Sequence, residues 1–200
     1  TDGAPQLQEY DLSNYALGYA YFQRKDKEDY SNANISFRKF LLSKNKYDDN
    51  KVTDATIRAA DCYFMNRDFI QASEYYKTAI DLNKMDVDYA LYQKALCDGL
   101  SKKYNEKITE LQRIEKKFPA SPYLSASLNE IAETYYNNLK DYENAITYYE
   151  RILSNYPNSS FAFNCNAQLG NIYYERKQDD KAFLYYDKFV KADSKSDAAK

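Results

Sequence analysis

The sequence predicts an all-α solenoid, a stack of helix pairs, and three observations predict it. A set of aromatic and small residues recurs about every 35 to 42 positions along the 200 residues. Gly and Pro number only four each, so that long helices are unbroken. Within each repeat, apolar residues fall three or four positions apart, which is the spacing of one helical face. A repeat of this period indicates hairpins that pack on their neighbours.

Five repeats fill the chain, and each pairs a first helix with a second helix. The second helix has an anchor position, Ala in four repeats and Lys107 in the third. The anchors at 33, 72, 107, 145 and 182 are 39, 35, 38 and 37 residues apart. In the third repeat Asp98 also replaces an expected tyrosine, which puts its local packing in doubt. The other first helices carry Leu17-Gly18 with Tyr21, Ala59-Ala60 with Tyr63, Ile131-Ala132 with Tyr135, and Leu169-Gly170 with Tyr173.

The predicted organisation is a lead-in over 1–11 and one solenoid over 12–195. Two junctions, at 118–122 and 156–159, contain Pro to stop a helix and Ser to cap the next. The turn from Gln23 to Glu28 is longer than the others and is expected to be exposed, whereas the turn over 137–141 is short and polar. The predicted repeats span about 12–48, 52–84, 87–119, 122–157 and 160–193, and 196–200 is the start of a further, truncated helix, as in a piece of a longer protein.

Small and aromatic residues define the predicted core. Gly18 and Gly170 fall inside helices, and we expect the paired helix to approach them closely, with Ala33 and Ala182 facing them. The three cysteines are an odd number and are interpreted as packing residues rather than a disulfide framework. The tyrosines at repeated positions are predicted to be core residues: Tyr21, Tyr63, Tyr76, Tyr135, Tyr149, Tyr173 and Tyr186.

Composition argues against several classes of function. The net charge of −2 and the pI near 5.4 give no basic surface for a nucleic-acid backbone. No apolar run has the roughly 18 residues of a membrane span. The chain contains no histidine, which removes serine–histidine, cysteine–histidine and histidine–metal chemistry. Acidic pairs such as Asp48-Asp49 lie in polar turns and favour a solvated surface. We therefore predict no enzyme activity and no cofactor or metal.

These residues resemble the tetratricopeptide repeat (TPR) family, whose pattern is Trp, Leu-Gly and Tyr, followed by Ala and Phe and then Pro. The fifth repeat matches best, with Leu169-Gly170, Tyr173, Ala182 and Tyr186. The resemblance covers about 185 of the 200 residues and implies a right-handed α-solenoid of about five hairpins. The expected Trp is absent, and its positions hold Asn14, Thr56, Leu91, Leu128 and Asn166.

The junctions Tyr156-Pro157-Asn158-Ser159 and Phe118-Pro119-Ala120-Ser121 are similar to those of the bacterial envelope branch of this family. That branch includes the Tol-associated periplasmic protein and the outer-membrane assembly lipoprotein. The resemblance implies the bacterial periplasm or cell envelope first and the cytoplasm second.

In the TPR family the first helix of each pair lines a concave groove. Transferred to this sequence, the groove suits an extended or helical peptide, and its acidic residues discriminate against acidic partners. It lacks the Lys and Asn set with which relatives that bind chaperones clamp a C-terminal carboxylate. The groove residues are Tyr15, Tyr19, Phe22, Ile57, Asp61, Phe64, Met65, Tyr92, Leu96, Asn129, Glu133, Tyr136, Asn171, Tyr174 and Glu175.

The sequence therefore predicts a non-catalytic scaffold that binds a protein or peptide partner on the concave face. One alternative is the interaction arm of a larger enzyme or regulator whose catalytic domain lies outside this sequence. Another is a glycan-binding module of the cell envelope, based on the tyrosines. The apolar end of the groove, from Tyr15 to Phe64, could instead be covered by other parts of a longer chain or by a second copy, and exposed terminal repeats allow a homo-oligomer.

Overall fold

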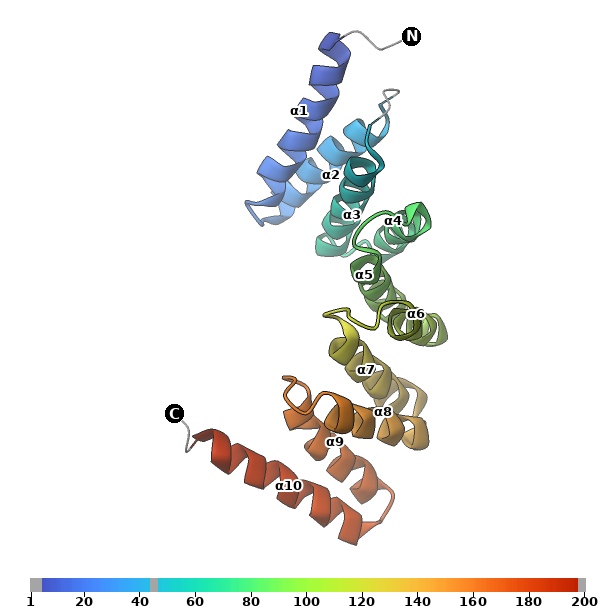
Figure 1. Ribbon diagram of the computed structural model, residues 1–200, viewed down its shortest axis with the longest axis vertical. Coiled ribbons are helices and arrows are strands. Elements are labelled where there is room, and N and C mark those ends of the chain that lie inside the picture. Colours follow the sequence, from blue (N-terminus) through green and yellow to red (C-terminus); the bar gives the residue numbers. More distant parts are fainter. Residues whose placement is uncertain (1–4, 44–46, 198–200) are drawn as a thin grey trace. The chain divides into compact units, whose positions relative to one another are not determined.

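The computed structural model describes residues 5–43 and 47–197, and every regular element in these residues is helical (Figure 1). This confirms the predicted all-α fold. The elements are α1 (Pro5–Phe22), α2 (Lys27–Leu41), α3 (Asp49–Met65), α4 (Phe69–Leu82), α5 (Val87–Leu100), α6 (Tyr104–Lys117), α7 (Leu124–Glu133), the π-helical segment η1 (Thr134–Leu139), α8 (Tyr142–Asn155), α9 (Ala162–Glu175) and α10 (Asp179–Asp197).

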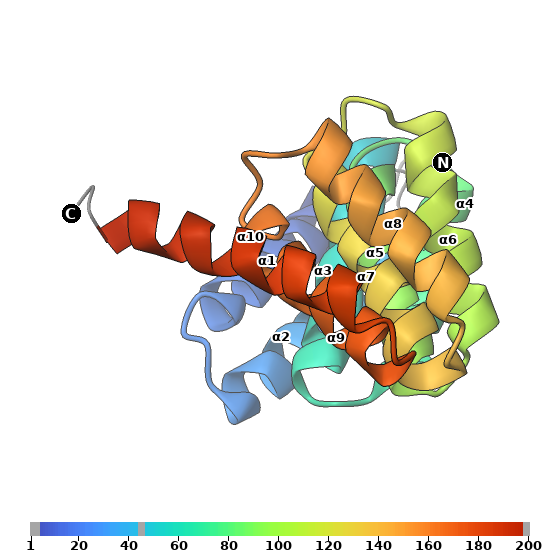
Figure 2. The ribbon, with the colours of Figure 1, turned by 90° about the horizontal axis from the view of Figure 1, so that it is seen from below.

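The chain divides into two compact units, Thr1–Glu110 and Leu111–Lys200, and the boundary falls inside α6. In the first unit each helix from α1 to α4 packs on the next one along the chain. In the second unit α7, α8, α9 and α10 do the same, and Figure 2 shows α10 beside α9. Packing between sequential neighbours is the property that defines a solenoid.

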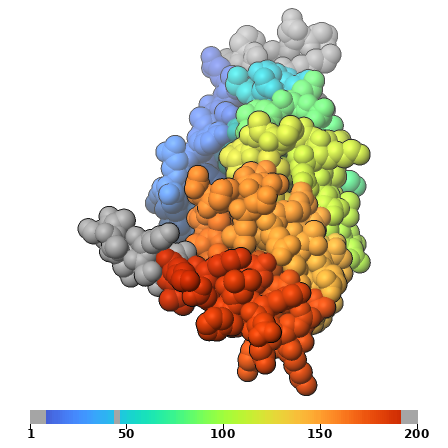
Figure 3. All heavy atoms as spheres, turned by 60° about the horizontal axis from the view of Figure 1, so that its bottom comes forward, coloured from blue at the N-terminus to red at the C-terminus, as the bar shows by residue number. Residues whose placement is uncertain are grey.

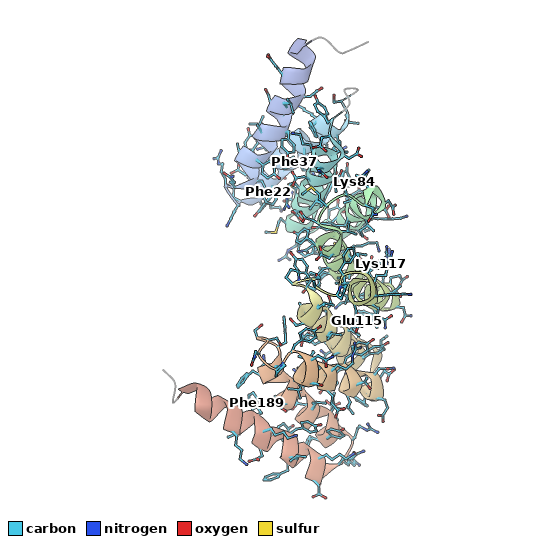
Figure 4. All side chains as sticks on the ribbon, viewed as in Figure 1. Phe22, Phe37, Lys84, Glu115, Lys117 and Phe189 are labelled. Carbon is cyan, nitrogen blue, oxygen red and sulfur yellow. The ribbon has the colours of Figure 1, made fainter. Side chains whose placement is uncertain are left out.

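Aromatic rings lie against two helical glycines, Gly18 and Gly170, and one of these rings, Phe37, is labelled in Figure 4. A Cβ atom on Gly18 would lie 2.7 Å from the ring of Phe37, and one on Gly170 would lie 2.6 Å from the ring of Tyr186. The predicted close approach of the paired helix is confirmed. The expected facing residues are wrong, because the nearest side chain is the ring four positions after Ala33 or Ala182.

The repeated tyrosines occupy two environments instead of one. Tyr76 and Tyr149, on second helices, are fully buried as predicted. Three other tyrosines pack against the first ring of a tyrosine doublet. Tyr135–Tyr148 and Tyr173–Tyr185 are stacked, with centroids 5.9 and 5.5 Å apart, and Tyr63–Tyr75 is tilted, with centroids 5.3 Å apart. Tyr21, Tyr63, Tyr135 and Tyr186 are only half-buried, so the prediction that they belong to the core is too strong for them.

A basic residue in the left-handed conformation turns the chain within each helix pair. The residues are Lys25, Arg67, Lys102, Lys140 and Lys177, with φ between 56° and 63°. In the last four of these turns the backbone N–H of the next residue bonds to a carbonyl near the end of the first helix, as in the 2.9 Å bond from Asp68 N to the carbonyl of Tyr63. Such left-handed caps satisfy the last carbonyls of a helix. The turn after α1 is exposed from Gln23 to Glu28, as predicted.

The turn of the fourth repeat differs because it contains one more residue. We count from the repeated tyrosine of the first helix, or from Asp98 in the third repeat, to the anchor of the second helix. This separation is nine positions in repeats two, three and five (63 to 72, 98 to 107, 173 to 182), but ten from Tyr135 to Ala145. The chain takes up the extra residue as η1, a π-helical segment. The predicted polar turn over 137–141 is therefore helical as far as Leu139.

The third repeat replaces an aromatic pair by charges that satisfy one another. Lys94 lies 2.7 Å from Asp98 and 3.2 Å from Glu110, and Asp98 also accepts a hydrogen bond from Ser73. The stem of Lys107 fills the space beside Gly99. These contacts explain how the departures from the repeat pattern are accommodated.

The ends of the described chain differ from the prediction. Helix α1 begins at Pro5, inside the proposed lead-in, while residues 1–4 lie outside the described residues. Ser196 and Asp197 belong to α10, so that the described part of 196–200 begins no further helix, and residues 198–200 lie outside the description. Side chains of α10, in red, lie on the face of the molecule toward the viewer in Figure 3. The cysteines Cys62, Cys97 and Cys165 are free and buried, as expected for packing residues.

Candidate functional site

The fifteen candidate residues lie on the first helices of their pairs and on η1, and they form two groups. The first-unit face comprises Tyr15, Tyr19 and Phe22 of α1, Ile57, Asp61, Phe64 and Met65 of α3, and Tyr92 and Leu96 of α5. The second-unit face comprises Asn129 and Glu133 of α7, Tyr136 of η1, and Asn171, Tyr174 and Glu175 of α9.

Two tyrosines of the first-unit face hold a carboxylate of the next repeat. The hydroxyls of Tyr15 and Tyr19 both donate to Oδ2 of Asp54, the former at 2.6 Å. Burial, followed by the hydrogen bond to Asp54, raises the pKa of Tyr19 to about 12 and raises that of Tyr15 further. These hydroxyls therefore join α1 to α3 and stay protonated.

Arg58 links this pair to a second carboxylate, Asp61. Its guanidinium lies beside both Asp54 and Asp61, and its carbon atom is 5.9 Å from the ring centroids of Phe22 and Tyr89. Cations over aromatic faces gain electrostatic attraction in addition to their ion pairs. The arginine thus connects α1, α3 and α5 within the first unit.

Both carboxylate oxygens of Asp61 have partners inside the first unit. Its Oδ1 accepts from the hydroxyl of Tyr76 at 2.6 Å and from that of Tyr89 at 2.8 Å, while Oδ2 pairs with Arg58. Burial raises the pKa of Asp61, and Arg58 and the two hydroxyls oppose that rise. Asp61 is 6% exposed and Ile57 is fully buried, so both are core residues instead of groove residues.

The rest of the first-unit face is more accessible. Phe64 is half-buried and packs edge-on against Phe69, with ring centroids 5.5 Å apart. Met65 is 50% exposed, and Tyr92 and Leu96 are half-buried.

The polar residue at the position of Asp61 has a recurring role. In the fifth repeat Asn171 occupies this position, and its Oδ1 accepts from the hydroxyl of Tyr186 at 2.8 Å. Both pairs are separated by fifteen residues. In the first repeat the pair is aromatic, because Tyr19 stands at this position and Phe37 lies edge-on to it, with centroids 5.3 Å apart. The polar candidates Asp61 and Asn171 therefore each accept a hydrogen bond from the second-helix tyrosine of their own repeat.

The fourth repeat breaks this pairing. Glu133 holds the equivalent position, but it accepts from Nδ2 of Asn129 at 3.0 Å instead of from Tyr149. The hydroxyl of Tyr149 is buried and has no hydrogen-bond partner among the described residues. Burial, followed by the charge of Glu133, raises the pKa of this phenol. The extra residue of η1 lies between Glu133 and Tyr149 and lengthens their separation to sixteen residues.

Glu175 is the most strongly hydrogen-bonded of the exposed candidates. It accepts from the hydroxyls of Tyr136 at 2.7 Å and Tyr142 at 2.9 Å. These two bonds lower its pKa, and the charge of Lys140 acts in the same direction. Next to it, the ring of Tyr174 is 66% exposed. The second-unit face therefore combines an accessible aromatic ring with polar groups.

Sequence reasoning missed four residues of these networks, namely Asp54, Arg58, Tyr89 and Tyr142. The signal for Asp54, Arg58 and Asp61 was present, because spacings of four and three residues place charges on one side of a helix. The tyrosine partners come from neighbouring helices, and no spacing within one helix shows them.

The described residues offer little for covalent or metal chemistry. Burial raises the pKa of the thiols of Cys62, Cys97 and Cys165 to about 12, which keeps them protonated. No group of three or more metal-ligating side chains occurs within 5–43 and 47–197. In the same residues, none of the helices has the length and apolar character needed to cross a bilayer.

Comparison with known proteins agrees with this architecture. The family model for the tetratricopeptide repeat matches residues 130–159 and 168–196. No curated protein matches the sequence. A crystal structure of MamA is 18% identical, with a TM-score of 0.75 over 96% of this chain and 96% of that one.

Two further structures show the same fold. PilF of Pseudomonas aeruginosa is 19% identical, with a TM-score of 0.64 over 93% of this chain and 78% of that one. The TPR-like repeats of a kinesin light chain from Podosopora anserina are 15% identical, with a TM-score of 0.68 over 92% and 95%.

The fold is thus a TPR-like α-solenoid, and the match in the fourth and fifth repeats supports the tetratricopeptide repeat family. Repeats of this family typically serve as scaffolds for protein–protein interaction. The resemblance to the envelope branch stays a prediction.

Proposed function

We propose that this protein is a non-catalytic scaffold that binds a peptide segment of a partner protein along the first helices of its repeats. In this proposal the second-unit face makes the specific contacts. The first-unit face acts mainly as a rigid support, because its polar groups already bond to one another.

The accessibility of the second-unit face carries the proposal. Tyr174 exposes 66% of its surface, and Asn129, Glu133 and Asn171 are partly exposed around it. Tyrosine is enriched where proteins bind, since its ring supplies apolar area and its hydroxyl a hydrogen bond. By contrast, Asp54 and Asp61 in the first unit accept hydrogen bonds from four tyrosines.

Selection from a phage-displayed peptide library tests this function. We expect the 200-residue chain to enrich peptides whose affinity falls by about ten-fold or more in Tyr174→Ala, as for an aromatic anchor at a binding site. Phe183→Ala is the matched control, because Phe183 is a 74% exposed aromatic residue of α10 in the same unit. Peptides that bind Tyr174→Ala as well as the original chain, or no enrichment at all, would contradict the proposal.

A further inference from the structure

The second-unit face carries two carboxylates without a cationic partner. Glu133 accepts one hydrogen bond, from Asn129, and Glu175 accepts two, from Tyr136 and Tyr142. Within the described part of the chain no lysine or arginine forms an ion pair with either carboxylate. The charge of Lys140 helps to lower the pKa of Glu175, but the Lys140 ammonium lies over the ring of Tyr136, 5.7 Å from the centroid, and forms no ion pair with Glu175. Neither carboxylate therefore has an ion-pair partner among the described residues.

The second repeat shows how an equivalent carboxylate is neutralised. Asp61, at the position that corresponds to Glu133, is paired with Arg58, three residues earlier on the same helix. The residue three positions before Glu133 is Glu130, which cannot supply a cation. The second repeat thus contains its own guanidinium, whereas the fourth repeat does not.

The buried hydroxyl of Tyr149 is an independent sign that Glu133 is not held by the core phenol as Asp61 is. In the second and fifth repeats the corresponding phenol bonds to Asp61 or Asn171. Tyr149 is fully buried, and its hydroxyl has no hydrogen-bond partner in the described part of the chain, where Glu133 bonds to Asn129 instead. A buried hydroxyl without a partner is costly and calls for an explanation. An outward contact that uses the Glu133 carboxylate provides one.

We propose that the second-unit face binds an arginine side chain of the partner peptide, with the carboxylate of Glu133 as its acceptor. This inference rests on the proposed function and names the chemistry of its ligand. A guanidinium has five N–H donors in one plane, so that it can form two parallel hydrogen bonds to one carboxylate. Lysine, as a single point of charge, fits this arrangement less well.

Tyr149 competes with the partner in this scheme. If Glu133 turns inward, it can accept from the Tyr149 hydroxyl, as Asp61 does from Tyr76. Arginine binding keeps Glu133 outward, where Asn129 orients it. Removal of the Tyr149 hydroxyl should therefore favour the state that binds arginine, since the apparent affinity depends on the fraction of competent state.

An array of synthetic peptides tests the inference. Four sets share the same mixed neutral flanks and differ at the central residue, which is Arg, Lys, Gln or Glu. We expect the chain to bind Arg-centred peptides about ten-fold more tightly than Gln-centred ones at physiological salt, and Glu133→Gln to abolish this preference. Tyr149→Phe should preserve or increase it. Asp180→Asn is the control, because it removes one exposed negative charge from the same unit and should leave the preference unchanged.

The outcomes separate this inference from the proposed function. Peptides that bind through Tyr174 without any preference for arginine would overturn the inference and leave the scaffold function intact. An equal loss of the arginine preference in Glu133→Gln and Asp180→Asn would also overturn the inference, because net charge alone would then explain the preference. If Glu133→Gln does not fold, Asn129→Ala replaces it: this variant frees Glu133 to turn inward, and an undiminished arginine preference in it contradicts the inference.

Discussion

The tyrosines that pack from the second helix of a repeat carry hydroxyls that need a hydrogen-bond acceptor, and in two repeats the first helix supplies it. Asp61 serves Tyr76, and Asn171 serves Tyr186, in both cases fifteen residues before the phenol. Sequence reasoning assigned these polar residues to a ligand groove by resemblance. The same spacing was visible in the sequence, but its meaning depends on which side chains meet between paired helices, and helical periodicity alone does not show that.

The phenols allow a direct comparison at the residue scale. Tyr76→Phe removes a hydroxyl bonded to a buried carboxylate, and we expect it to lower the free energy of unfolding by about 1.5 to 3 kcal/mol. Tyr149→Phe removes a hydroxyl without a partner, so its free energy of unfolding should be unchanged or higher. Chemical denaturation of both variants measures the difference. A loss in Tyr149→Phe equal to that in Tyr76→Phe would mean that Tyr149 has an acceptor in solution.

At the scale of the helix pair, the fold depends on glycines that let an aromatic ring lie against the first helix. The sequence predicted this closeness at Gly18 and Gly170, because glycine inside a helix needs a compensating reason. It did not predict which side chain lies there. The ring of Phe37 or Tyr186 reaches back along its own helix toward the glycine, in the direction that helical side chains favour.

Gly170→Leu tests this packing. A Cβ atom alone would approach the Tyr186 ring to 2.6 Å, so the larger side chain must displace the ring or the helix. We expect overpacking to lower the free energy of unfolding by about 1 to 3 kcal/mol, despite the better helix propensity of leucine. Thermal and denaturant unfolding would measure the loss. Unchanged stability would refute the register of the α9–α10 pair.

At the scale of the whole molecule, the internal repeat made the fold predictable. Each repeat carried the same apolar spacing, so that a weak signal in one was supported by the others, and even the charged third repeat could be placed. The division into two compact units could not be predicted, because it falls within α6, whose sequence contains neither Pro nor Gly. The candidate site was less predictable, since it depends on hydrogen bonds between repeats.

Stability should fall at alkaline pH because of the tyrosines. In the unfolded chain their pKa is about 10. In the folded chain burial and the neighbouring Asp54 raise the pKa of Tyr19 to about 12, and burial raises those of Tyr76 and Tyr149 as well. A raised pKa means that the folded state keeps protons that the unfolded state loses, so the stabilisation is complete below pH 10 and is lost between about 10 and 12.

Denaturant unfolding at several pH values, together with phenolate absorbance, checks this expectation. The free energy of unfolding should be nearly constant from about pH 6 to 8, where a chain without histidine has few titrating groups. It should then decrease, because the unfolded chain loses protons from its three cysteine thiols at about pH 8.5 and from its tyrosines at about pH 10, whereas the folded chain keeps them. Tyrosine titration in the folded chain should lag behind that in denaturant. A constant free energy through pH 11 would contradict the raised values.

The π-helical segment η1 has a consequence for how such a chain can change over time. By taking up one extra residue locally, it leaves the spacing of every later repeat intact, so that Ala145 and Tyr149 still reach the interior of their pair. An insertion at this place rotates only the residues just before it. A one-residue insertion in a first helix could thus change the direction of a surface carboxylate, which substitution alone would not do. The neighbouring helix pairs would keep their alignment.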